Sequence, residues 1–128
     1  MSDIVLDASA ILAVIHGEPG AERLTTDLLA RSVCSTVNLA EVTGKLVSRG
    51  WSVAEAWEDA TIPVRAVLDF TEEHAKLNAG LVQLTRPLGL SLGDRACIAL
   101  GLSLRAPVYT TDKSWSKLQL PIRVHVLR

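Results

Sequence analysis

IVLDAS, residues 4–9, gives the strongest indication of the fold. Three apolar residues are followed at once by Asp7, a residue type that is favoured as the N-cap of a helix. A short, wholly apolar strand is typical of a parallel sheet covered by helices on both faces. The same change from buried strand to helix recurs along the chain, and this alternation indicates an α/β fold with a parallel sheet.

The rest of the chain alternates the same two kinds of element. Strands are predicted at 4–6, 33–35, 64–68, 107–110 and 122–126, and helices at 8–15, 20–31, 37–49, 52–62, from 71 onward, 91–104 and 112–118, with a loop at 86–89. Residues 122–126 alternate strictly between apolar and polar side chains, and this alternation predicts an edge strand with one face exposed to solvent. Thr71 has capping-box spacing, with Glu72 or Glu73 as its partner. Since no repeat or linker interrupts this pattern, residues 1–128 are expected to form a single domain.

Composition narrows the class of protein. A hydrophobic fraction of 48% with 21% charged residues is that of an ordinary globular chain. The net charge of −1 offers no overall attraction to nucleic acid, so any such binding needs a local patch. The N-terminal apolar run is interrupted by Asp3 and Asp7, and no segment is long enough to span a membrane. Cys34 and Cys97 lack metal-ligand spacing and are expected to be buried thiols, as in a reducing cytoplasm. A cytoplasmic protein is therefore expected, and the lack of a membrane-spanning segment predicts no membrane partner.

Four carboxylates follow the ends of predicted strands or open the helices beside them: Asp7, Glu41, Asp94 and Asp112. In a parallel α/β sheet these junctions lie along one edge, where ligands bind. Two carboxylates about 5 Å apart repel by roughly 3 kcal/mol at an effective dielectric constant near 20. Four would lose on the order of 10 kcal/mol, comparable with the stability of a whole domain. Such a cluster must bind protons or a cation.

The ligand types point to the cation. Only oxygen ligands are present, which favours Mg²⁺ or Mn²⁺ over zinc. Such an ion at a cluster of acids suits the hydrolysis of a phosphodiester. His16, His74 and His125 have no ligand spacing and are expected at the surface or at an edge.

Other polar residues surround these acids. Ser9, Asn38 and Thr111 are candidates for supporting the site, and Arg95, Lys113 and Lys117 for contacting phosphates, although a solvated helix face explains the three basic residues equally well. Trp115 is expected to pack its short helix onto the sheet.

Each acid also has a structural explanation. Asp7 and Asp112 can cap the helices that follow them. Asp94 completes a capping box with Ser91, and Glu41 has the spacing of an ion pair with Lys45. Only their joint placement at one sheet edge favours catalysis.

Four segments resemble the acidic motifs of PIN-domain ribonucleases, in the branch of the VapC toxins of type II toxin–antitoxin systems. They are Val5–Ala10, Asn38–Val42, Leu90–Cys97 and Thr110–Trp115, of which the SLGDRAC portion is the most specific. The resemblance covers nearly the whole chain and implies a three-layer domain with a five-stranded parallel sheet between helices.

The resemblance also implies an activity and partners. It implies an endoribonuclease dependent on Mg²⁺ or Mn²⁺, with Asp7 and Asp94 as principal metal ligands and with Glu41 and Asp112 completing the pocket directly or through water. Asp112 is also counted among the expected metal ligands. The implied partners are structured RNA such as transfer RNA, a second copy of the chain, and a cognate antitoxin that silences the toxin.

Two rival enzyme classes fit less well. A phosphoacceptor receiver domain requires paired acids after the first strand, and a haloacid-dehalogenase-type phosphatase requires Asp-x-Asp where this chain has Asp7-Ala8-Ser9. The non-enzymatic alternative is a module of the same fold that binds RNA or protein without cleaving RNA.

Overall fold

The computed structural model describes residues 2–128, which contain a five-stranded sheet whose strands all run parallel. In chain order the strands are β1 (Ile4–Leu6), β2 (Ser32–Ser35), β3 (Ala66–Leu68), β4 (Val108–Thr110) and β5 (Val124–Val126). β3 begins later than predicted because the Val64 amide donates to the carbonyl of Thr61 and not to a neighbouring strand. β5 is an edge strand as predicted, but its three residues are all half-buried and show no wet face.

Helices lie between the strands as the alternation predicts. They are α1 (Ala8–His16), α2 (Thr26–Leu29), α3 (Thr36–Ser48), α4 (Val53–Thr61), α5 (Glu72–Gly80), α6 (Val82–Thr85) and α7 (Leu92–Leu104), with 3-10 turns η1 (Ala21–Arg23), η2 (Arg86–Leu88) and η3 (Lys113–Lys117). The helix predicted at 20–31 is divided into η1 and α2, because the Thr25 hydroxyl accepts from the amide of Leu28 and starts a new helix. The predicted loop at 86–89 contains η2, and the short helix predicted at 112–118 is η3.

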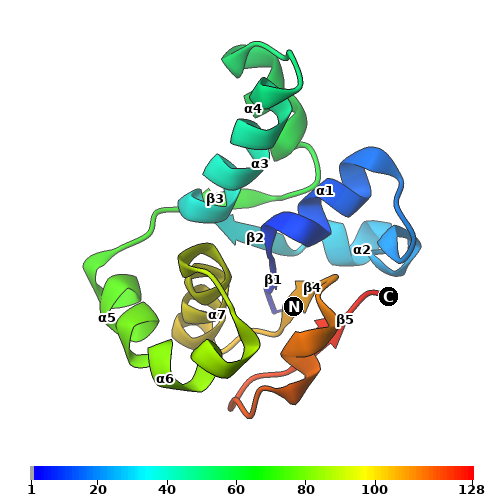
Figure 1. The fold of residues 1–128 in the computed structure, drawn as a ribbon. Coiled ribbons are helices and arrows are strands. Elements are labelled where there is room, and N and C mark those ends of the chain that lie inside the picture. Colours follow the sequence, from blue (N-terminus) through cyan, green and yellow to red (C-terminus); the bar gives the residue numbers. More distant parts are fainter. Residues whose placement is uncertain (1) are drawn as a thin grey trace.

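The sheet separates two hydrophobic cores. Alternate residues of β1 point to opposite faces, so Ile4 and Leu6 join the core under α1, α3 and α4, whereas Val5 joins the core under α7. Figure 1 shows α1, α3 and α4 on one side of the sheet and α5, α6 and α7 on the other. Trp115 of η3 is fully buried in the second core, as predicted. The three-layer α/β arrangement with a five-stranded parallel sheet is therefore confirmed.

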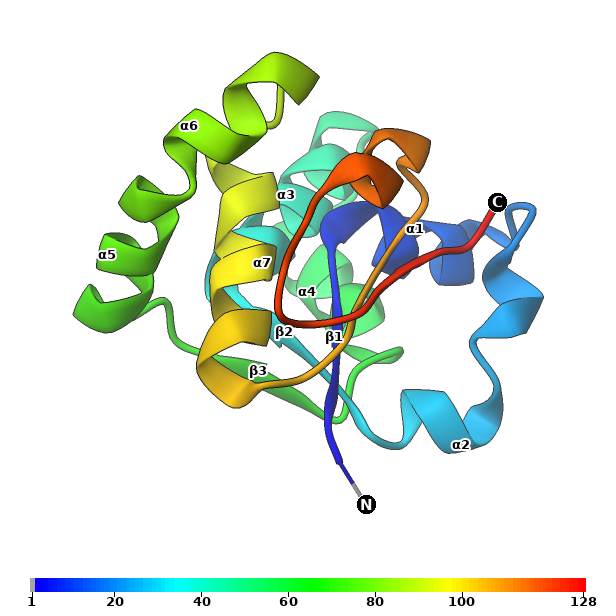
Figure 2. The same ribbon diagram turned by 90° about the horizontal axis from the view of Figure 1, so that it is seen from below.

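The strand order β3-β2-β1-β4-β5 reverses direction between β1 and β4. In open parallel sheets the crevice at the carboxyl ends of such a strand pair is the usual ligand site. Leu6 pairs with Tyr109, so the next residues along, Asp7 and Thr110, lie side by side at that edge. Figure 2 shows β1 passing into α1 at the end of the sheet where α7 begins and where η3 lies, opposite the N-terminus.

Two expectations are wrong around α5. Its capping box joins Thr71 to His74 and not to an acid: the Thr71 hydroxyl accepts from the His74 amide (3.1 Å), and His74 Nδ1 accepts from the Thr71 amide (3.3 Å). This contact buries His74, which was expected at the surface. His16 is exposed as predicted. His125 lies in the edge strand β5, and its ring stacks on that of Tyr109 in β4 with centroids 4.5 Å apart.

The cysteines and the lengths of the helices complete the description of residues 2–128. Cys34 and Cys97 are free and buried, as predicted. Between residues 2 and 128, no helix is long and apolar enough to cross a membrane.

Candidate active site

Asp7 lies at the centre of the carboxyl edge. It follows β1 and is the N-cap of α1, where its Oδ1 accepts from the amide of Ala10 (2.8 Å) and the hydroxyl of Ser9 (2.7 Å). Its Oδ2 accepts from the hydroxyl of Thr110 (2.6 Å) at the end of β4. The capping role and the position in the crevice therefore belong to the same side chain. A carboxylate has about four lone-pair sites, so three hydrogen bonds leave roughly one for a ligand.

Burial is the main influence on the pKa of Asp7. The residue is only 4% exposed, and this desolvation raises its pKa from 3.8 to about 6. The hydrogen bonds from Thr110, Ser9 and Ala10 oppose the rise, whereas the negative charge of Asp94 adds to it. A raised carboxyl pKa marks a site where negative charge is poorly compensated. A cation beside Asp7 would remove that deficit.

A network of hydroxyl groups joins β1 to the segment after β4. Ser9 Oγ accepts from the amide of Thr111 (3.0 Å) and lies 3.3 Å from Thr110 Oγ1. Thr110 Oγ1 in turn accepts from the amide of Asp112 (3.1 Å). Ser9, predicted as a supporting residue, thus contacts both Asp7 and the segment after β4. Thr111 takes part through its backbone, and Thr110, which the sequence argument did not single out, is the main side-chain partner of Asp7.

Glu41 comes to the same edge from α3. Its Oε1 accepts from Asn38 Nδ2 (3.0 Å), and Asn38 Nδ2 also donates to the carbonyl of Gly93 (2.9 Å) in α7. A Cβ at Gly93 would lie closer than 3.0 Å to the carboxyl carbon and both carboxyl oxygens of Glu41, so any larger residue would have to displace this flexible carboxylate. Within residues 2–128, Glu41 forms no ion pair with Lys45. The ion pair with Lys45 that could have explained Glu41 structurally is therefore not formed.

Asp94 opens α7 on the opposite wall. Its Oδ2 accepts from the amide of Ser91 (2.8 Å), and its own amide donates to the Ser91 hydroxyl (3.2 Å), so the predicted capping box is formed. Cys97, one turn further along α7, is fully buried, and burial raises the pKa of its thiol. The charges of Asp7, Asp94, Cys34 and Glu41 add to that rise, so the thiol stays neutral.

Asp112 stands apart from the other three acids. It is exposed, and its Oδ1 accepts from the amide (2.9 Å) and the hydroxyl (2.8 Å) of Ser114 as the N-cap of η3. Its link to Asp7 runs through its backbone amide and Thr110. Lys113 and Lys117 are exposed in the same turn. Asp7, Glu41 and Asp94 therefore lie along the same edge of the sheet without closing around one point among residues 2–128, whereas the Asp112 carboxylate is bound within its own turn.

Arg95 does not line this edge, contrary to expectation. Its Nε donates to Asn78 Oδ1 (3.0 Å) in α5, and its Nη1 donates to the carbonyl of Leu90 (3.1 Å). Successive residues of a helix point about 100° apart, so the neighbour of Asp94 is directed away from the carboxylates. Arg95 joins α7 to α5.

The donor set fits a hard divalent cation. Asp94 Oδ1 and Glu41 Oε2 have no hydrogen-bond partner among residues 2–128, and the buried Asn38 Oδ1 has none either. No three His, Cys, Asp or Glu side chains in that range already surround one point as a metal site would require. Mg²⁺ needs only one or two carboxylates and completes its shell with water and substrate. The predicted ligands Asp7 and Asp94 therefore fit the ion better than Asp112 does.

Comparisons with solved structures agree with this architecture. The chain is similar to VapBC2 of Rickettsia felis bound to a promoter DNA fragment (17% identity, 98% of each chain covered, TM-score 0.74). It is also similar to DNA-bound VapBC of Salmonella typhimurium (16% identity, 100% of each chain, TM-score 0.74). A third similar structure is the Mycobacterium tuberculosis toxin VapC20, described as cleaving the sarcin–ricin loop (20% identity, 94% of this chain and 99% of that chain, TM-score 0.72).

Comparisons of the sequence alone give one match. No curated protein matches the chain. A comparison with protein families matches residues 4–120 to the PIN domain. The match spans more than half of the sequence and includes all four acids, and the chain therefore belongs to the PIN-domain family.

Proposed function

We propose that this chain is the toxin of a type II toxin–antitoxin pair of the VapC kind, and that it hydrolyses RNA phosphodiester bonds with Mg²⁺ or Mn²⁺. One observation carries the proposal: a carboxylate that is 4% exposed, Asp7, lies within electrostatic reach of Asp94 at the carboxyl edge of the sheet. Such an arrangement is unfavourable for a purely structural site. It is suited to a site that binds a cation.

The chain's own residues have distinct tasks in this function. Asp7 and Asp94 would hold the ion, which when bound activates water and neutralises charge on the leaving oxygen. Ser9 and Thr110 hold the Asp7 carboxylate in one orientation. Asn38 donates to both Glu41 and the Gly93 carbonyl and so holds the Glu41 carboxylate, which would accept a proton from water. The Asp112 carboxylate, bound to Ser114, would act only at the rim.

An antitoxin partner is part of the proposal. A toxin–antitoxin complex from Klebsiella pneumoniae is among the similar structures, at an identity that shows only a shared fold. This chain also exposes apolar side chains along and just after α4: Val53 (69% exposed), Trp57 (47%) and Ile62 (74%). Exposed apolar residues grouped on one element are typical of protein–protein contacts. They support a protein partner, whether an antitoxin or a second copy of the chain.

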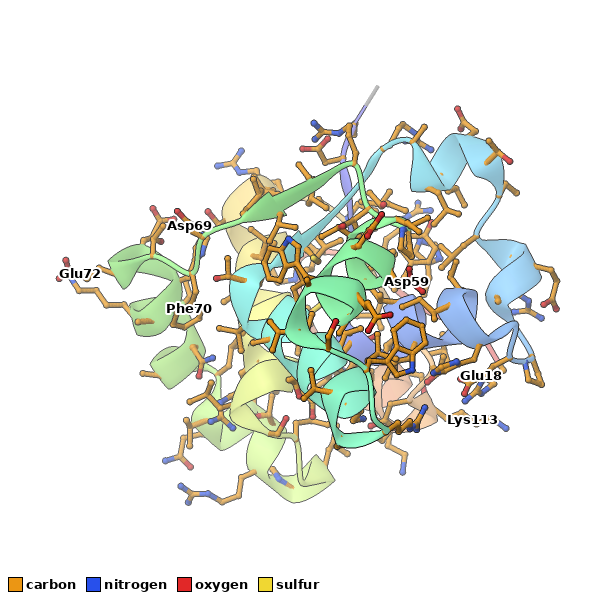
Figure 3. The ribbon with its side chains drawn as sticks, turned by 90° about the horizontal axis from the view of Figure 1, so that it is seen from above. Glu18, Asp59, Asp69, Phe70, Glu72 and Lys113 are labelled. Atoms are coloured by element: carbon orange, nitrogen blue, oxygen red, sulfur yellow. The ribbon has the colours of Figure 1, made fainter. Side chains whose placement is uncertain are left out.

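The activity is tested by incubating purified protein with structured RNA, including transfer RNA, in Mg²⁺, Mn²⁺ or EDTA. Cleavage is expected with either metal and is expected to stop with EDTA. Asp7→Asn and Asp94→Asn should each abolish it. Asp69→Asn is the matched control, since Asp69 also follows a strand but is exposed beyond the outermost one, β3, beside Phe70 and Glu72 (Figure 3). Cleavage that persists in Asp94→Asn would refute the mechanism.

A module that binds RNA or protein without cleaving RNA is the alternative. The absence, between residues 2 and 128, of three acids already grouped around one point favours it. The same assay separates the two functions, because a binding module would retain RNA without producing new ends. For the toxin function, expression in bacteria should arrest growth and co-expression of the cognate antitoxin should relieve the arrest. Normal growth despite abundant active-site-intact protein would contradict it.

A further inference from the structure

A second polar pocket adjoins the candidate active site. Its volume is about 230 Å³, and Ser9 and Thr111, both part of the hydroxyl network around Asp7, form one of its walls. Water occupies roughly 30 Å³ per molecule in the liquid, so the pocket is large enough for a phosphate group with some of its hydration. The ionisable residues of the opposite wall are His16, Glu18, Lys45, Arg49 and Arg128.

Two helices present these residues on one face. In α1, Ser9 and His16 are seven residues apart and therefore share a side of the helix. In α3, Glu41 and Lys45 are four residues apart and also share a side. The polar stripe of α3 thus begins with a carboxylate in the active site and continues with a cation in the pocket. The two sites therefore adjoin one another along α1 and α3.

The pocket has an excess of positive charge. Glu18, the one acid among the described lining residues, is paired with Arg128 (3.4 Å), which also donates to the carbonyl of Pro19 (3.0 Å). Arg49 Nη1 lies 3.0 Å from His16 Nε2, and since a guanidinium can only donate, the imidazole nitrogen accepts. Lys45 has no ion-pair partner within residues 2–128. Lys45 and Arg49 therefore remain uncompensated.

We propose that this pocket binds a backbone phosphate of the RNA next to the phosphate that is cleaved, with Lys45 and Arg49 as the residues that bind it. This inference rests on the proposed function, because it places a neighbouring phosphate relative to the acidic site. The active-site carboxylates repel a polyanion, and adjacent cations offset that repulsion. A guanidinium already oriented by His16 is suited to bind phosphate oxygens.

The test measures RNA binding separately from cleavage. A fluorescent single-stranded RNA is titrated in EDTA with the full chain and with its Lys45→Ala and Arg49→Ala variants, at several salt concentrations. Each variant should bind roughly five- to tenfold more weakly, as expected for one lost charged contact. Each should also lower the slope of log K against log salt by about 0.7. Lys76→Ala is the control: it removes one exposed positive charge from α5, where Lys76 pairs with Glu72. Figure 3 shows Glu72 on the opposite side of the view from Glu18 of the pocket.

A second series locates the phosphate. RNAs that carry one neutral methylphosphonate linkage at successive positions should reveal a linkage at which the unmodified protein loses affinity. Lys45→Ala should lose nothing further at that linkage. The proposal is overturned if Lys45→Ala and Arg49→Ala behave like Lys76→Ala, if no form of the protein binds RNA, or if the variants weaken only the antitoxin complex. Each variant's thermal unfolding is compared with that of the unsubstituted protein to verify folding.

The outcomes for the pocket and for the proposed function are distinguishable. RNA cleavage with a KM unchanged in Lys45→Ala would remove the pocket from substrate binding and leave the nuclease function intact. If RNA binding depends on Lys45 but no metal supports cleavage, the phosphate pocket would be retained and the nuclease function refuted. Lys45→Arg should restore binding if the positive charge is what matters.

Discussion

Replacement of Asp7 by Asn should stabilise the metal-free protein at neutral pH. Burial raises the pKa of Asp7 from 3.8 to about 6, so the folded state tolerates the neutral carboxyl better than the carboxylate. The contribution of Asp7 to stability is thus most favourable below pH 3.8 and is lost as the pH rises through about 6. That rise in pKa corresponds to about 3 kcal/mol at full ionisation. Asn is neutral at every pH and avoids this loss.

The hydrogen-bond network can accept this substitution. Asn is as good an N-cap as Asp, so its amide oxygen can still accept from Ala10 and Ser9. The new amide group would face Thr110, whose hydroxyl can accept from it and donate to Ser9 Oγ, 3.3 Å away. The volume of the side chain is unchanged. The gain from removing the buried charge should therefore exceed the disturbance of the network.

Urea unfolding in EDTA measures the effect. At about pH 8 the free energy of unfolding of Asp7→Asn should exceed that of the unsubstituted protein by up to about 3 kcal/mol. Near pH 4 the difference should fall below about 1 kcal/mol. Added Mg²⁺ or Mn²⁺ should stabilise only the protein that retains Asp7. Asp69→Asn, at an exposed position, should show neither the pH dependence nor the loss of metal stabilisation.

One result would refute this reasoning. If Asp7→Asn were less stable than the unsubstituted protein by a similar amount at both pH values, the carboxylate would be a favourable cap. Its burial would then not penalise the charge, and the need for a cation at Asp7 would disappear.

Three further substitutions test the geometry around the acids. Gly93→Ala should place a methyl group where the carboxylate of Glu41 lies and push that flexible carboxylate aside, so RNA cleavage should fall in an initial-rate assay while thermal unfolding shows a change in stability of no more than about 1 kcal/mol. Thr110→Val should remove a buried hydroxyl that donates to Asp7 and thereby raise the pKa of Asp7 further, so the acidic limb of the pH–rate profile should move to higher pH; an unchanged profile would count against the contact. Ser91→Ala should remove the α7 cap and cost about 1 kcal/mol of unfolding free energy, with equal stability in urea as the contrary outcome.

Much of the fold follows from local patterns. The short apolar run at 4–6 and the repeated change from strand to helix predict an α/β sheet, because strand burial and helix capping depend on neighbouring residues. The same rules correctly predict Asp7 and Asp112 as N-caps and Asp94 as the capping-box partner of Ser91. They do not predict the capping role of His74 or the division of residues 20–31, because side-chain hydrogen bonds at Thr71 and Thr25 decided both.

The candidate site divides in the same way. The order of residues alone predicts acids at strand ends and in the first turns of the neighbouring helices, and hence an acidic edge of a parallel sheet. Which of these acids come close to one another depends on the packing of the helices. Contact between α3 and α7 at Gly93 brings in Glu41, helix rotation turns Arg95 away, and the Asp112 carboxylate stays on its own turn. Capping is local in the chain, whereas convergence depends on how distant helices pack, and that packing is absent from any single stretch of sequence.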